Sequence, residues 1–209
     1  MNNFDMIIFD IDGTLWDTSE ITTEASNIIA HDYDEVEEVS LDLIRSIMGL
    51  SLENVAKRMM PYLSLDKAIY YVKLRIDKTN ELLNEKGGNT YCGVINTIRK
   101  LSHNYKLGIV TNNYDDYAKV FLKTTNLEDC FTDYIGTATY GITKAEAISK
   151  MIKRNNAKRA CYVGDIEKDM EAAIQSNTTF IHAKYGFDPR LHSDLYIDNF
   201  TELCDMLGD

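Results

Sequence analysis

Short, unbroken apolar runs recur along the chain, and each of them ends at polar residues. Three strong runs cover residues 6–9, 107–110 and 160–163, and a weaker one covers residues 178–181. Runs of this length, bounded by glycine and polar residues, are typical of strands that are buried on both faces of a parallel sheet. We therefore expect these segments to be strands of one parallel sheet.

Between and after these runs, apolar residues recur at the spacing of an amphipathic helix. Such patterns cover residues 94–101, 117–123, 147–152 and 170–174. Strands that alternate with helices of this length indicate βαβ units, in which neighbouring strands are parallel. The sequence therefore predicts an α/β fold.

The stretch from residue 16 to residue 86 has a different pattern. It contains helical patterns at residues 18–30, 40–48, 52–60 and 66–83, and no convincing strand pattern. Gly87-Gly88-Asn89 then closes the stretch before strands and helices alternate again. The pattern predicts an α/β core domain made of residues 1–15 and 87–209, with a helical domain of residues 16–86 inserted after the first strand.

Composition and charge narrow the class of protein. The 209 residues are 44% hydrophobic and 26% charged, which excludes a disordered or fibrous chain. A net charge of −11 argues against a nucleic-acid backbone or an anionic membrane as the main partner. No apolar run is long enough to span a membrane, and the first residues lack the pattern of a signal peptide. The four cysteines are widely spaced without a metal-binding motif, so we expect reduced thiols and a cytoplasmic protein.

Chemically capable side chains follow three of the expected strands at their carboxyl ends. They are Asp10, Asp12, Thr111, Asn112, Asp165 and Asp169. In an open parallel sheet, ligands bind at this edge, so residues far apart in the chain can meet there. Any one of them could simply cap the helix that follows. Their equivalent placement on successive strands favours a shared site.

The order of these residues resembles the motifs of the haloacid dehalogenase (HAD) superfamily. Asp10-Ile11-Asp12-Gly13-Thr14 resembles the first motif, Thr111-Asn112 the second, Lys144 at a helix start the third, and Gly164-Asp165-Ile166-Glu167-Lys168-Asp169 the fourth. The resemblance extends from about Phe4 to the last helix. It implies a Rossmann-like parallel-sheet core with an inserted helical cap, as in the subgroup of phosphoglycolate phosphatases and β-phosphoglucomutases.

The same resemblance implies a Mg²⁺-dependent phosphatase that hydrolyses a small phosphomonoester through an aspartyl-phosphate. Asp10 would be the nucleophile, and Asp12 the general acid and base. The implied Mg²⁺ ligands are Asp10, the backbone carbonyl of Asp12, Asp165 and Asp169. The implied phosphate-binding residues are Gly13, Thr111, Asn112 and Lys144.

Two positions depart from the pattern of many relatives. Ala145 follows Lys144 where those relatives have proline, which weakens the match to the third motif. Ser176-Asn177 stands where they often have Ala-Gly at the end of the last motif's helix. Asparagine tolerates the left-handed conformation that ends helices, so we expect this turn to be kept.

The helical domain resembles a cap that selects the substrate. Its candidate specificity residues are Arg45, Met48, Gly49 and Leu50. β-Phosphoglucomutases carry a lysine just before this glycine and an arginine three residues after it, whereas this chain has Met48 and Leu52. The loss of both charges favours a hydrolase over a mutase.

Two alternatives stay open at the level of sequence. One is a β-phosphoglucomutase-like phosphotransferase that uses the same site. The other is a catalytically silent HAD-fold binding protein, which would be expected to have lost one of the motif carboxylates. The expected partner is a small phosphorylated metabolite, and the expected state is a monomer or a homodimer.

Overall fold

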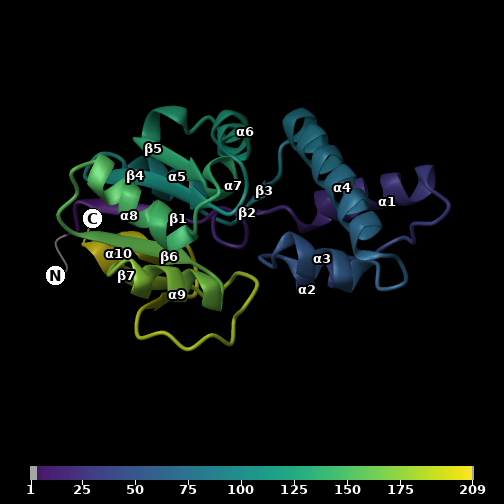
Figure 1. Ribbon diagram of the computed structural model, residues 1–209. Coiled ribbons are helices and arrows are strands. Elements are labelled where there is room, and N and C mark those ends of the chain that lie inside the picture. Colours follow the sequence, from purple (N-terminus) through teal and green to yellow (C-terminus); the bar gives the residue numbers. More distant parts are fainter. Residues whose placement is uncertain (1–3, 209) are drawn as a thin grey trace. The chain divides into compact units, whose positions relative to one another are not determined.

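The computed structural model describes residues 4–208, which divide into two compact units (Figure 1). The α/β unit combines the chain up to Asp17 with the chain from Asn89 onward, and the helical unit is Thr18–Gly88. Strand β2 (Trp16–Asp17) pairs antiparallel with β3 (Asn89–Thr90) inside the α/β unit. Because this ribbon ties both ends of the insertion to the α/β unit, Trp16 and Asp17 belong there and not to the helical domain.

A six-stranded sheet forms the centre of the α/β unit, and its paired strands are parallel. In spatial order the strands are β5 (Asp133–Gly136), β4 (Lys106–Thr111), β1 (Met6–Phe9), β6 (Ala160–Gly164), β7 (Thr179–Ala183) and β8 (Tyr196–Ile197). All four apolar runs are strands of this sheet. The prediction of an α/β fold with a Rossmann-like parallel sheet is confirmed.

Helices cover both faces of the sheet. They are α5 (Val94–Leu101), α6 (Asp115–Thr125), α7 (Thr137–Tyr140), α8 (Lys144–Arg154), α9 (Glu167–Gln175) and α10 (Glu202–Leu207), with a 3₁₀ turn at Glu128–Cys130. Side chains alternate along β1 because successive residues of a strand point to opposite faces. Ile8 shares a buried cluster with Ile148 of α8 and Ala172 of α9, whereas Phe9 contacts the rings of Phe131 and Phe200.

The hydrophobic pattern missed the shortest elements. Strands β5 and β8 lie at the two edges of the sheet, and β8 and both ribbon strands have only two residues each. An edge strand is paired on one side and is often short and polar. Asp133 and Tyr134 at the start of β5 are half-buried, so no apolar run marks that strand.

Four helices make up the helical unit: α1 (Ser19–Asp32), α2 (Leu41–Ile47), α3 (Leu52–Met59) and α4 (Leu65–Lys86). They match the four helical patterns in this stretch. Their apolar faces share one core that includes Ile29, Ile44, Met60 and Val72. Helix α4 ends where Gly87 takes a φ of +70°, a conformation that suits glycine. Among the described residues, no helix is both long and apolar enough to cross a membrane.

The side chain of Asn27 in α1 is hydrogen-bonded to the backbone of the loop that connects α1 and α2. Its Oδ1 accepts from the Val39 N–H at 2.8 Å, and its Nδ2 donates to the Val39 carbonyl at 3.1 Å. These two bonds satisfy backbone groups of a partly buried loop, which are costly to leave unpaired.

We therefore predict that Asn27→Ala lowers the free energy of unfolding by about 1–3 kcal/mol. The matched control is Asn84→Ala, because Asn84 is exposed and its amide donates only within its own helix, to the Asn80 carbonyl. Urea unfolding followed by circular dichroism measures both variants. Equal losses in the two variants would contradict the prediction.

Candidate active site

The sheet places the candidate residues at one edge. Phe9 pairs with Ile109 of β4 on one side and with Val163 of β6 on the other, so the three parallel strands end near the same edge of the sheet. Asp10 follows β1 directly, and its N–H continues the ladder to the Val163 carbonyl at 2.9 Å. Thr111 is the last residue of β4. The strand register thus brings residues from three distant parts of the chain together.

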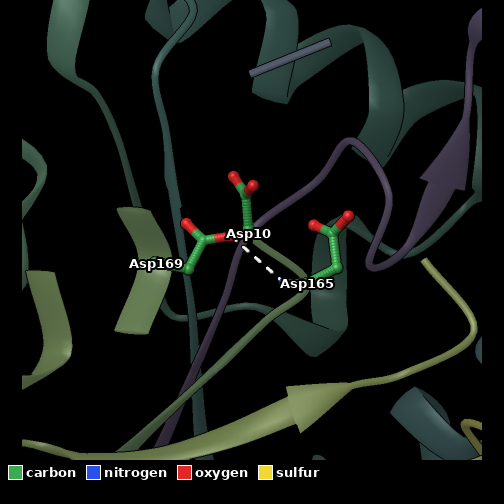
Figure 2. Close-up of side chains that lie close together, drawn as sticks. All are labelled: Asp10, Asp165 and Asp169. Atoms are coloured by element: carbon green, nitrogen blue, oxygen red, sulfur yellow. Dashed lines mark hydrogen bonds between the residues drawn. The ribbon is translucent and has the colours of Figure 1, made fainter. Parts of the chain in front are cut away.

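Three buried carboxylates form a cluster at this edge (Figure 2). One oxygen from each of Asp10, Asp165 and Asp169 lies within 4.8 Å of the others. Asp10 is 6% exposed, and the other two are completely buried. Close, buried carboxylates repel one another and lose hydration, so such a cluster needs positive charge nearby.

Lys144 supplies part of that positive charge. Its Nζ lies 2.6 Å from Asp169 Oδ1 and 3.2 Å from Asp10 Oδ2, and the side chain is buried. Burial alone would lower the pKa of Lys144, but the charges of Asp10 and Asp169 outweigh it, so the pKa is raised and the ammonium stays charged. One lysine against three carboxylates leaves the site with a deficit of positive charge whenever all three are ionised.

A helix start fixes the position of Lys144. The Thr143 hydroxyl accepts from the Glu146 N–H at 3.2 Å, and the Glu146 carboxylate accepts from the Thr143 N–H at 2.7 Å. This reciprocal arrangement is a capping box, and it begins α8 at Lys144. The lysine is therefore held in the first turn of the helix even though Ala145, and not proline, follows it.

Asp169 is held by several donors. Its Oδ2 accepts from the backbone N–H groups of Asp165 and Ile166, at 3.1 and 3.3 Å, and its Oδ1 faces Lys144. These bonds shape the turn between β6 and α9. A Cβ at Gly164 would lie 2.5 Å from the Asp169 Cβ, so the close approach requires glycine there.

Asp165 is oriented by two other segments. Its Oδ1 accepts from the Thr14 hydroxyl at 3.3 Å, and its Oδ2 accepts from the Phe187 N–H at 2.8 Å. Phe187 lies in the loop after β7, whose backbone passes so close that a Cβ at Gly186 would lie 2.4 Å from the Asp165 Cβ. Phe187 is not among the residues predicted from the sequence, although the strand that precedes its loop is one of the four apolar runs.

Gly13 occupies a position of the site where no side chain would fit. Its φ is +82°, and a Cβ there would lie 2.0 Å from Asp165 Oδ2 and 2.6 Å from the Phe187 ring. The sequence placed Gly13 among the phosphate-binding residues. Its N–H donates to the Trp16 carbonyl at 2.9 Å, and the absence of a Cβ makes room for the Asp165 carboxylate.

Asp12 lies at the rim of the site and is half-buried. The Tyr117 hydroxyl donates to its Oδ1 at 2.5 Å, and Asn113 Nδ2 donates to its Oδ2 at 3.2 Å. Sequence reasoning named Asn112, but Asn112 is exposed, and it is the next residue that reaches Asp12. Tyr117 was missed as a site residue because a tyrosine in an amphipathic helix pattern is typical of core packing.

Thr111 is buried, and its hydroxyl oxygen accepts from the Asn113 N–H at 3.3 Å. A hydroxyl that accepts one hydrogen bond can still donate another. Thr111 therefore adds a potential donor to the same strand edge as Lys144 and the three carboxylates.

The four cap candidates lie in the helical unit. Arg45 is in the last turn of α2, where its Nε donates to the Ser19 hydroxyl at 3.2 Å. Met48 ends that helix, Gly49 has a φ of +75°, and the Leu50 N–H donates to the Ile47 carbonyl at 3.1 Å. Met48, Gly49 and Leu50 form a tight turn that leads from α2 toward α3, and Arg45 lies in the helix just before it.

Burial and crowding raise the pKa of two of the clustered carboxyls. Burial raises the pKa of Asp10 to about 7; Lys144 opposes this shift, while Asp169 and Asp12 add to it. Burial also raises the pKa of Asp165 well above its usual range, with repulsion from Asp169 and Asp10 adding to the effect and the Phe187 N–H opposing it. The cluster is therefore electrostatically strained when it holds no cation besides Lys144.

The fold and the site define an α/β protein with an acidic centre at one edge of its sheet. Comparison with known proteins identifies its family. The family model described as haloacid dehalogenase-like hydrolase matches residues 7–183. The chain belongs to this family. In the solved structures, the chain resembles a haloacid dehalogenase-like family hydrolase from Streptococcus pneumoniae, with a TM-score of 0.85, 23% identity and 99% coverage of both chains.

Curated relatives carry phosphatase names. The chain is 27% identical over 177 residues to pyrophosphatase PpaX of Listeria innocua, covering 82% of this chain and 79% of that protein. It is 23% identical over 216 residues to a phosphoglycolate phosphatase of Photobacterium profundum, covering 96% of this chain and 94% of that protein. The family and the enzyme class predicted from the sequence, a HAD-superfamily hydrolase with phosphatase relatives, are confirmed.

We predict that Gly13→Ala destabilises the protein more than Gly141→Ala does. Both glycines have positive φ, so both variants carry left-handed strain of roughly 1–2 kcal/mol. A Cβ at Gly13 also collides with Asp165, whereas a Cβ at Gly141 meets nothing within 4 Å. The collision adds about 1–3 kcal/mol. Chemical unfolding of the two variants measures the difference, and equal stabilities would show that the carboxylate has room to move.

Raised carboxyl pKa values predict how stability depends on pH in EDTA. The stabilisation that comes from protonated Asp10 and Asp165 is complete below the unfolded value of 3.8. It is lost as pH rises, through about 7 for Asp10. Asp165→Asn removes one of the repelling charges, so we expect it to melt several degrees above the wild type at pH 7.5, with the difference shrinking toward pH 4.

The control for that measurement is Asp129→Asn, which removes a charge from an exposed residue outside the cluster. It accounts for the general effect of reducing the net charge of −11. An Asp165→Asn protein that melts below the wild type at every pH would mean that the bonds from Thr14 and Phe187 outweigh the repulsion.

Proposed function

We propose that this hydrolase is a Mg²⁺-dependent phosphatase that cleaves a small phosphomonoester through an aspartyl-phosphate. One observation carries the proposal: Asp10 stands at the end of the central strand, 3.2 Å from the Lys144 ammonium and beside two more buried carboxylates. A carboxylate in this position can attack a phosphoryl group if positive charge neutralises the repulsion between them.

The donor set fits a magnesium ion. Mg²⁺ is a hard cation that prefers carboxylate, carbonyl and water oxygens, and the cluster offers three carboxylates against one lysine. Asp10, Asp165 and the backbone carbonyl of Asp12 would hold the ion. Asp169, whose oxygens already face Lys144 and two backbone N–H groups, would act directly or through water. The bound ion would supply the positive charge that the cluster lacks.

The chain's own residues can carry both chemical steps. An oxygen of Asp10 forms a bond to phosphorus while the bond to the leaving oxygen breaks, and Asp12 gives its proton to that oxygen. In the second step Asp12 takes a proton from a water molecule, whose oxygen attacks phosphorus. The Asp10–phosphorus bond then breaks, which releases inorganic phosphate and restores Asp10. Thr111 and Lys144 would hold the phosphoryl oxygens throughout.

The substrate class follows from the relatives and from the helical unit. Relatives named phosphoglycolate phosphatase and pyrophosphatase point to small, soluble phosphate compounds. We assign the helical unit the role of a cap, with the turn at Arg45, Met48, Gly49 and Leu50 as its substrate-reading element. Uncharged Met48 and Leu52 leave this turn without the charges of a mutase, which favours water over a second sugar phosphate as acceptor.

We predict that Asp10→Asn lowers turnover by at least about 10³-fold while the fold is kept, because the amide cannot form the covalent intermediate. Phosphate release from p-nitrophenyl phosphate, phosphoglycolate and pyrophosphate is measured with Mg²⁺ and with EDTA. Asp129→Asn is the matched control for the loss of one charge, and it should turn over at the wild-type rate.

Metal binding is followed separately by thermal melting. Mg²⁺ should raise the wild-type melting temperature, because an ion that binds only the folded state stabilises it, and Asp165→Asn should lose this response. Activity within tenfold of wild type in Asp10→Asn would place the nucleophile elsewhere. Wild-type activity that survives EDTA would remove Mg²⁺ from the mechanism.

A further inference from the structure

Both oxygens of the Asp12 carboxylate are held by side chains that follow β4. The Tyr117 hydroxyl donates to Oδ1 at 2.5 Å, and Asn113 Nδ2 donates to Oδ2 at 3.2 Å. A carboxyl group keeps acceptor capacity on its oxygens whether it is ionised or protonated, so both donors can hold Asp12 before and after it gives up its proton. A donor on each oxygen fixes the rotation of the carboxyl group as well as the direction of the side chain.

The Tyr117 ring is anchored by packing, so its hydroxyl has a defined position. Tyr117 is 7% exposed, and its ring centroid lies 6.0 Å from that of Trp16, which is completely buried. Phe121, one helical turn further along α6, lies 5.3 Å from the same indole. A β-bridge joins Trp16 back to Asp12. Trp16 therefore connects to both residues: its ring packs against Tyr117, and its backbone is bridged to Asp12.

We propose that Tyr117, assisted by Asn113, is a positioning residue that holds the Asp12 carboxyl group in the orientation needed to exchange a proton with the leaving-group oxygen. The inference rests on the proposed function, because it assigns Asp12 the acid role in the first step. The proton moves from Asp12 to the leaving oxygen as the bond from that oxygen to phosphorus breaks. Tyr117 keeps its own proton and acts only through Asp12.

The basicity of the leaving group separates this role from a purely structural one. p-Nitrophenolate is a weak base and departs with little help from an acid, whereas the alkoxide of benzyl alcohol is a strong base and needs a proton as it leaves. A misplaced Asp12 should therefore slow the benzyl ester much more than the nitrophenyl ester. General damage to the site should slow both esters alike.

The experiment compares kcat/KM for p-nitrophenyl phosphate and benzyl phosphate with Mg²⁺ present. This constant covers only the steps up to departure of the alcohol, so slow hydrolysis of the aspartyl-phosphate does not obscure it. Tyr117→Phe removes the hydroxyl and keeps the ring. We expect its benzyl-to-nitrophenyl ratio to fall by about tenfold or more, within the range that general acid catalysis contributes.

Asn113→Ala should shift the ratio in the same direction by a smaller factor, because its bond to Asp12 is longer. The matched control is Tyr114→Phe, which removes a hydroxyl from a ring that is 58% exposed and near the same helix start. This variant should keep the wild-type ratio. Thermal melts of the three variants show whether each is folded. If Tyr117→Phe does not fold, the benzyl-to-nitrophenyl ratio of Asn113→Ala tests the positioning role.

Equal losses on both esters in Tyr117→Phe, or no loss on either, would overturn the positioning role and leave the proposed function standing. A wild-type protein that releases no phosphate from either ester with Mg²⁺ would overturn the proposed function, and this inference with it. A ratio that falls in Tyr117→Phe and stays constant in Tyr114→Phe is the result that supports the role of Tyr117.

Discussion

The repulsion among three buried carboxylates, only partly balanced by Lys144, is the constraint on which the site depends. Asp10, Asp165 and Asp169 lie too close together and too deep to be stable as anions in an isolated pocket. The protein tolerates them because backbone N–H groups, a hydroxyl and one ammonium hold their oxygens. The remaining deficit of positive charge suits the centre to a divalent cation. Under the proposed function, that cation would in turn offset the repulsion between Asp10 and the phosphoryl group.

Several local features exist to keep these charges close together. The capping box at Thr143 and Glu146 begins α8 where Lys144 can reach two carboxylates. Glycines at positions 13, 164 and 186 let backbone and carboxylates approach to distances that a Cβ would forbid. The geometry of the site therefore depends on these three glycines as well as on its charged side chains.

The site consists of two groups of residues: the buried carboxylate cluster with Lys144 and Thr111, and Asp12 with its two donors. Under the proposed function, the buried cluster would receive the phosphoryl group, whereas Asp12 would face the part of the substrate that leaves. Asp12 is held by donors from the segment after β4, so the strand that ends in Thr111 contributes to both groups. The proposed acid and the proposed nucleophile are thus oriented independently although they are only two residues apart.

The sequence by itself determined the α/β class, the four main strands, the helical insertion and the charged residues at the strand ends. These features are local: an apolar run or a helical period reflects the face that each segment buries. Only the tertiary structure decided which side chains meet. No hydrophobic periodicity indicates four of the features described above: the short edge strands, the ribbon at Trp16, the loop at Phe187 and the contact of Tyr117 with Asp12. They arise where distant segments pack against one another. The hydrophobic pattern of one segment shows which face is buried, but it does not show which other segment covers that face.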